Sequence, residues 1–194
     1  MPIAMTAAPM RAVADRSLVA HLLVVLVGSW LLAAISQIEI PMEPVPLTMQ
    51  TFGVLMIGAL CGFRLSFQIL AAYLIQGAVG LPFFAGGAGG YVHLIGKTGG
   101  YLFGFLVAAS AIGWLRDKGL ASSWYALIGA LTLGHVIVFA IGVPWLAMYI
   151  GMENAWVYGF VPFILGTVLK TALAAAVTLG LPKALPSLWN GPAA

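Results

Sequence analysis

Lys170 is the residue whose type and position most clearly indicate chemistry in this sequence. It lies about 15 residues into an apolar run over 155–181, near the middle of a membrane at about 1.5 Å of rise per residue. A charged lysine at the bilayer centre costs on the order of 2.5–3.5 kcal/mol. We therefore expect Lys170 to face a polar cavity and to hold an anionic group such as a carboxylate. The alternative is that its flexible stem snorkels to the interface.

Thr167 lies three residues before Lys170 and therefore on the same face of the helix. Its hydroxyl group could add a hydrogen bond to a ligand held by the lysine. A threonine within a helix also commonly bonds back to its own backbone. We predict that Thr167 and Lys170 both bind substrate.

The second candidate for ligand binding is the glycine-rich stretch over 80–101, GLPFFAGGAGGYVHLIGKTGGY, which joins two apolar runs. Its backbone N–H and C=O groups must be satisfied by water, protein or a ligand, because lipid cannot bond to them. A plain solvated connection is possible, but the length and the aromatic side chains favour a binding loop. With Gln50, which follows the proline-rich loop, the predicted binding residues here are Phe84, Gly86, Gly87, Gly89, Gly90, Tyr91, Lys97 and Tyr101.

No catalytic or metal-binding pattern is found. The GKT at 96–98 lacks the glycine of a phosphate-binding loop, because Tyr91 stands at that position. His21 and His93 are too far apart to indicate a metal site, and we expect neutral His135 to bond between helices. A Gly-x-Ser-x-Gly elbow is also missing. We predict that the protein is not an enzyme, although an intramembrane enzyme is the alternative from a different class.

The composition is that of an integral membrane protein. Of 194 residues, 62% are hydrophobic and only 7% are charged, whereas a soluble domain has about a quarter charged residues. The net charge of +3 is too small and too scattered for a nucleic-acid-binding face. The length suits a single membrane domain over 1–194.

Six apolar segments are long enough, or nearly so, to cross a bilayer as helices. We predict an all-α bundle of six transmembrane helices, with a kink at Pro144 in the fifth. After a tail over 1–16, the predicted spans are about 17–38, 48–63, 65–80, 99–115, 122–150 and 155–181.

The charged residues between these spans predict the orientation. Cytoplasmic loops carry an excess of Lys and Arg, and six spans put both termini on one side. On that side lie Arg11, Arg16, Arg64, Arg116, Lys118 and Lys183, whereas the other side has Lys97 with Glu39, Glu43 and Glu153. We therefore expect cytoplasmic termini, with the proline-rich and glycine-rich loops outside.

Four segments together resemble the BioY family of biotin-binding S-components of energy-coupling factor transporters. They are PVPLTMQTFGVLMIGALCG at 44–62, GAVGLPFFAGGAGG at 77–90, GKTGGYLFGF at 96–105 and PFILGTVLK at 162–170. The resemblance implies a six-helix S-component fold in the bacterial cytoplasmic membrane, with high-affinity uptake of biotin. It also implies partnership with a transmembrane T-component and ABC-type ATPases, although some members are thought to work without dedicated partners.

The resemblance assigns roles to single residues as well. Lys170 matches a lysine of the family, whereas Thr167 stands where the family often has an aspartate that is expected to contact the ureido ring of biotin. Lys97 stands where the family usually has proline. Ala20 is followed by Val24, so the docking motif of the first helix, Ala-x-x-x-Ala, is imperfect.

We therefore expect a biotin-binding subunit of a vitamin uptake transporter, with biotin as the transported substrate and no cofactor. Biotin offers a carboxylate for Lys170, and apolar parts for Phe84, Tyr91 and Tyr101. Two alternatives remain open: an S-component for another carboxylated vitamin, and a self-sufficient biotin facilitator.

Overall fold

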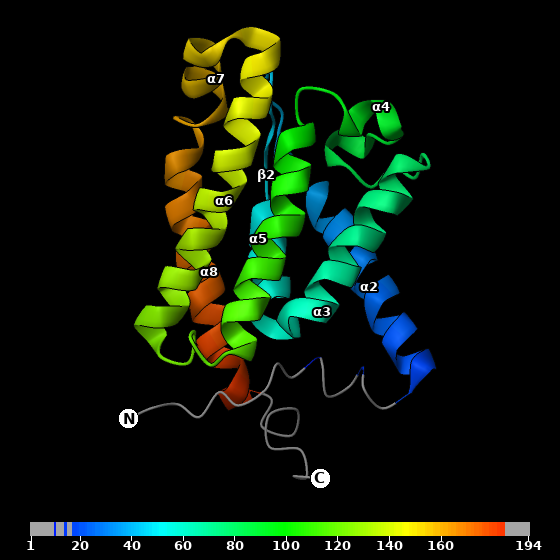
Figure 1. The fold of residues 1–194 in the computed structure, drawn as a ribbon, viewed down its shortest axis with the longest axis vertical. Helices are drawn as coiled ribbons and strands as arrows, with labels where there is room; N and C mark the ends of the chain where they lie inside the picture. Colours follow the sequence, from blue (N-terminus) through cyan, green and yellow to red (C-terminus); the bar gives the residue numbers. More distant parts are fainter. Residues whose placement is uncertain (1–9, 11–13, 15–16, 185–194) are drawn as a thin grey trace.

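The computed structural model describes residues 10, 14 and 17–184 and is mostly helical (Figure 1). The expected tail over 1–16 lies outside this part apart from residues 10 and 14. The elements are α2 (Leu18–Ser36), β1 (Glu39–Ile40), β2 (Leu47–Thr48), α3 (Gln50–Ala78), η1 (Ala85–Gly87), α4 (Tyr91–Leu94), α5 (Gly99–Asp117), α6 (Trp124–Ile150), α7 (Met152–Gly159) and α8 (Phe163–Ala184).

Within the described residues, five helices are long and apolar enough to cross a membrane: α2, α3, α5, α6 and α8. The prediction of an all-α membrane protein agrees with this. The expected spans over 48–63 and 65–80 are two legs of α3, which meet at Gly62. Gly62 has φ 72° and ψ 175°, a conformation open to glycine but not to most residues. Figure 1 shows the first leg descending from β2 and the second rising beside α2.

The expected span over 155–181 is instead divided into two helices. A short helix, α7, ends at Gly159, and the membrane-crossing helix α8 begins only at Phe163. Pro162 explains the break, because it has no N–H to donate and keeps the preceding residue out of the helical region. Pro144 does not interrupt its helix, since α6 runs through it from Trp124 to Ile150.

The proline-rich loop forms a small β-hairpin at one end of the bundle, which the sequence analysis did not predict. Strands β1 and β2 are antiparallel, with Glu39 opposite Thr48 and Ile40 opposite Leu47. The prolines between them exclude a helix here. The hairpin delivers the chain to the start of α3, so the Thr48 carbonyl lies beside the bundle interior.

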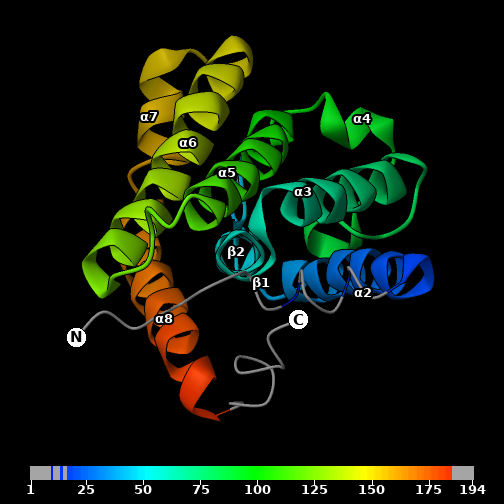
Figure 2. The same ribbon diagram turned by 60° about the horizontal axis from the view of Figure 1, so that its bottom comes forward.

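Helix α5 lies at the centre of the packing, between α3 and α6 (Figure 2). It is the most buried of the long helices, whereas α2, at the edge beside α3, is the least buried. Glycines allow the closest approaches. A Cβ atom on Gly113 of α5 would lie 2.5 Å from the carbonyl carbon of Gly62, at the bend of α3.

We predict that Gly113→Ala destabilises the bundle. The new methyl group would meet backbone atoms of Gly62, which cannot move as a side chain can, and overpacking typically costs about 1–3 kcal/mol. Thermal unfolding in detergent should therefore shift to a lower temperature. Gly129→Ala in α6 is the matched control, because no atom lies within 4 Å of its Cβ position. Equal unfolding temperatures for the two variants would contradict this account of the packing.

Candidate binding site

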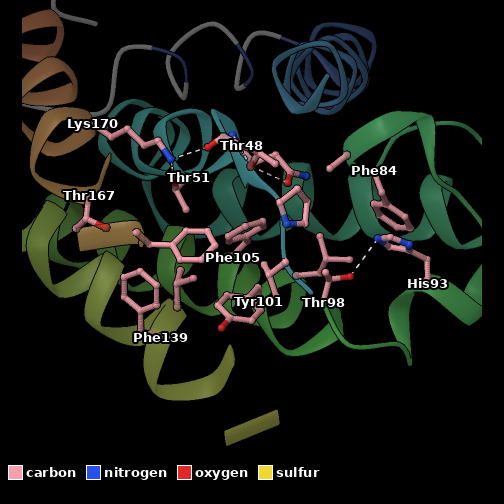
Figure 3. A pocket seen from close by; sticks show the side chains of 17 residues that line it. Thr48, Thr51, Phe84, His93, Thr98, Tyr101, Phe105, Phe139, Thr167 and Lys170 are labelled. Atoms are coloured by element: carbon pink, nitrogen blue, oxygen red, sulfur yellow. Dashed lines mark hydrogen bonds between the residues drawn. The ribbon is translucent and has the colours of Figure 1, made fainter. Parts of the chain in front are cut away.

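A cavity opens between the proline-rich loop, the glycine-rich stretch and helices α3, α5, α6 and α8 (Figure 3). Its empty volume is about 580 Å³, part of which is open to the outside. It is lined by Val45, Pro46, Thr48, Gln50, Thr51, Phe84, Ala85, His93, Thr98, Tyr101, Leu102, Phe105, Val138, Phe139, Phe163, Thr167 and Lys170.

Lys170 reaches into this cavity from α8, and its side chain is only 9% exposed. Its Nζ donates to the carbonyl oxygen of Thr48 at 2.6 Å and to Oγ1 of Thr51 at 3.0 Å. The side chain therefore turns into the bundle and does not snorkel. An ammonium group has three donors, so one N–H of Lys170 is left for a ligand.

The charge of Lys170 is not balanced within the lining. All lining residues belong to the described part of the chain, and among them Lys170 is the one lysine or arginine, with no aspartate or glutamate. Thr167, a little less than one turn before Lys170, presents a neutral hydroxyl group and not a carboxylate. The cavity is therefore positively charged at this end.

Aromatic side chains form much of the remaining wall. The ring of Tyr101 stacks on that of Phe163, with centroids 6.4 Å apart and planes at 25°. Phe139 packs edge-on against both rings. The Tyr101 hydroxyl donates to the carbonyl of Gly159 at 2.8 Å, so the ring is fixed in place and its polar group is satisfied. These flat faces suit an apolar ring or chain of a ligand.

Phe84, from the glycine-rich stretch, closes the cavity at the other end and is fully buried. Its ring lies over Gly77 of α3, where any side chain would collide with it. On its other side it stacks on His93, with centroids 5.1 Å apart and planes at 17°. The Nε2 atom of His93 lies 3.1 Å from Oγ1 of Thr98, and burial lowers the pKa of His93. The imidazole is therefore neutral at neutral pH.

Gln50 lies within a buried polar network beside the cavity. Its Oε1 accepts from the Thr48 hydroxyl at 3.1 Å, and its Nε2 donates to the Tyr73 hydroxyl. The Tyr73 hydroxyl in turn donates to the carbonyl of Phe83 at 3.1 Å. This network joins the start of α3 to the glycine-rich stretch.

Five of the predicted binding residues line the cavity: Gln50, Phe84, Tyr101, Thr167 and Lys170. Gly86, Gly87, Gly89 and Gly90 instead build the turns behind Phe84, and three of them have positive φ angles. Tyr91 is 68% exposed. Lys97 lines a separate hollow on the surface together with Glu43 and Asn154.

Sequence reasoning did not select His93 and Thr98 as binding residues, although the cavity includes both. The one feature of the sequence that could have indicated His93 and Thr98 is that both lie in the glycine-rich stretch, five residues apart. The expectation for His135 is confirmed, because its Nδ1 lies 3.2 Å from the Thr171 hydroxyl and links α6 to α8. Within the described residues no group of histidine, cysteine and acidic side chains could hold a metal ion.

Comparison with known proteins identifies the family of this chain. The model of the BioY family matches residues 5–187. The chain belongs to the BioY family. The resemblance stated from the four sequence segments is thereby confirmed.

BioY relatives are similar along most of the chain. The biotin transporter BioY of Thermotoga maritima is 39% identical over 160 residues, which cover 82% of this chain and 89% of the relative. The biotin transporter BioY2 of Lactococcus lactis subsp. cremoris is 33% identical over 169 residues, covering 84% and 91%. Because these relatives are transporters, the prediction that the chain is not an enzyme is confirmed.

A solved structure shares the fold. The crystal structure at 2.1 Å of the S-component for biotin from an ECF-type ABC transporter superposes with a TM-score of 0.76 and 26% identity, covering 85% of this chain and 92% of that one. The predicted S-component-like helical bundle is thus confirmed.

Proposed function

We propose that this chain is the membrane-embedded, biotin-binding subunit of a vitamin uptake transporter, with biotin as the transported substrate. The BioY relatives are named biotin transporters, and the structural neighbour is an S-component for biotin. The cavity is where the substrate binds, because it combines one free cationic donor with aromatic walls.

The observation that carries this proposal is the unbalanced charge of Lys170. A buried cation is costly unless an opposite charge pairs with it, and no acidic side chain lines the cavity. The carboxylate of biotin supplies the missing charge and accepts the remaining N–H. Such a charge-assisted hydrogen bond is roughly twice as strong as a neutral one.

The remainder of the substrate then extends toward Phe84. Tyr101 and Phe139 contact its apolar tail and thiophane ring. In Figure 3, Lys170 and His93 lie toward opposite ends of the row of lining side chains. The neutral His93 ring and the Thr98 hydroxyl are therefore the groups that we assign to the ureido ring. This orientation differs from the one that the family aspartate implies, because Thr167 lies beside Lys170 at the other end of the cavity.

We also propose that the chain lies in the bacterial cytoplasmic membrane with both termini inside. The bend of α3, the end of α5 and the start of α6 lie at one end of the bundle, and the hairpin and glycine-rich stretch at the other (Figure 1). The first end carries Arg64, Arg116 and Lys118 with one acidic residue, Asp117, whereas the second carries Lys97 with Glu39, Glu43 and Glu153. This asymmetry supports an outward-facing cavity.

A T-component and ABC-type ATPases are the proposed energy-supplying partners. The structural neighbour comes from an ECF-type ABC transporter, and this chain lacks a phosphate-binding loop of its own. Uptake of labelled biotin by cells that produce this chain alone, without any T-component, would contradict this part of the proposal.

The orientation is tested by labelling single cysteines in intact cells. We expect a cysteine at Ala88 to react with a membrane-impermeant thiol reagent from outside, because Ala88 is half-buried and lies between the exposed residues Gly87 and Gly89. A cysteine at Lys118 should react only after the cells are permeabilised. The opposite pattern would reverse the topology.

The substrate assignment is tested with Lys170→Met, which keeps the length and apolar bulk of the side chain but removes its charge. A hydrogen bond to a charged group contributes about 1.5–3 kcal/mol, so we expect biotin affinity to fall roughly tenfold to a hundredfold. Binding of biotin amide should change little, because it has no carboxylate. Calorimetry on the purified protein measures both affinities.

Lys118→Met is the matched control, because it removes a lysine from an exposed turn at the opposite end of the bundle. We expect it to leave both affinities unchanged. Equal weakening of biotin and biotin amide by Lys170→Met would show that Lys170 does not contact the carboxylate. Failure of the unchanged protein to bind biotin at all would contradict the proposed function itself.

A further inference from the structure

The amide group of Gln37, just after the end of α2, holds the glycine-rich stretch on two sides. Its Oε1 accepts from the backbone N–H of Gly87 at 2.8 Å. Its Nε2 lies 3.1 Å from the carbonyl oxygen of Phe84. Within α2, Nε2 also lies 2.7 Å from Oγ of Ser36 and 3.1 Å from the carbonyl oxygen of Ala33. Only one orientation of the amide satisfies these bonds together. The end of α2 is therefore tied to the residue that closes the cavity.

Phe84 depends on this attachment for its position. Its backbone N–H bonds to the carbonyl of Ala88 at 2.9 Å, so the segment folds back on itself behind the ring. The hydroxyl group of Ser36, in the last turn of α2, also lies 2.5 Å from the carbonyl of Phe83. The end of α2 thus contacts three residues of this segment: Phe83, Phe84 and Gly87.

Helix α2 itself is weakly held by the bundle. It is the least buried of the long helices, and its side-chain hydrogen bonds to α3 come from two glutamines. Gln68 bonds to His21 at 2.8 Å, and Gln76 bonds to Ser29 at 2.9 Å and to Trp30 at 3.0 Å. A helix with few buried contacts moves at a low free-energy cost, and a movement of its end pulls directly on Gln37.

We propose that Gln37 is a positioning residue of the binding site: it keeps the glycine-rich stretch closed over the cavity and couples the position of α2 to substrate release. The identity of the ligand in this inference rests on the proposed function. Gln37 does not line the cavity, so it acts through Phe84. Loss of its bonds frees the segment to swing outward with the phenyl ring, which opens the path for the substrate to leave.

The test uses Gln37→Met, which keeps the length of the side chain and removes both hydrogen-bonding groups. Gln76→Met is the matched control, because it also removes a glutamine side chain that bonds to α2, and this side chain has no hydrogen bond to the glycine-rich stretch. Release of labelled biotin from each purified variant is followed after addition of excess unlabelled biotin. Equal unfolding temperatures establish that both variants are folded.

We expect Gln37→Met to release biotin about fivefold faster, as the loss of its partly exposed hydrogen bonds to Phe84 and Gly87 predicts. The association rate should change less than twofold, and Gln76→Met should release biotin at the original rate. An unchanged release rate in Gln37→Met, or an equal acceleration in Gln76→Met, overturns the proposal.

Amide hydrogen exchange without ligand separates this inference from the proposed function. The backbone N–H groups over 84–90 should exchange faster in Gln37→Met than in the original protein, whereas Gln76→Met should leave them protected. If the original protein binds no biotin, the proposed function fails, but the exchange result still decides whether Gln37 holds this segment. Equal protection in all three proteins shows that it does not.

Discussion

The buried ammonium group of Lys170 is the interaction on which the rest of the site depends. Its charge lies within the bundle, held by the carbonyl of Thr48 and the hydroxyl of Thr51. Thr48 precedes Met49, the N-cap of α3, so its carbonyl lies outside the hydrogen-bond ladder of the helix. The Thr51 hydroxyl belongs to a side chain in the first turn of α3. The same geometry leaves one donor for a ligand and no side-chain carboxylate to compete with it.

Several constraints of the backbone place these groups together. The bend at Gly62 lets α3 return along the bundle, so its first leg can face α8 while its second supports the glycine-rich stretch. The absence of a side chain at Gly77 makes room for the ring of Phe84. Glycine therefore acts mainly by allowing close approach and tight turns, and aromatic and hydroxyl groups contact the cavity.

The sequence predicted the parts of this arrangement that follow from large free-energy terms. The cost of a charge in lipid correctly placed Lys170 in a cavity, and apolar runs correctly identified the long helices. The sequence did not reveal that Gly86, Gly87 and Gly90 turn the chain behind Phe84, because composition does not show which way a loop faces. A single histidine such as His93 forms no sequence motif that would mark it as a binding residue. The break between α7 and α8 follows from the local backbone geometry at Pro162, which the apolar pattern does not show.

The most direct test of this account is a structure of the protein with biotin bound. The account predicts a carboxylate oxygen of biotin about 3 Å from Nζ of Lys170, with the ureido ring toward His93 and Thr98 and the apolar parts against Tyr101 and Phe139. The reversed orientation, with the ureido carbonyl at Lys170 and the carboxylate at the opposite end of the cavity, would contradict the central claim that the unbalanced charge of Lys170 selects an anionic group.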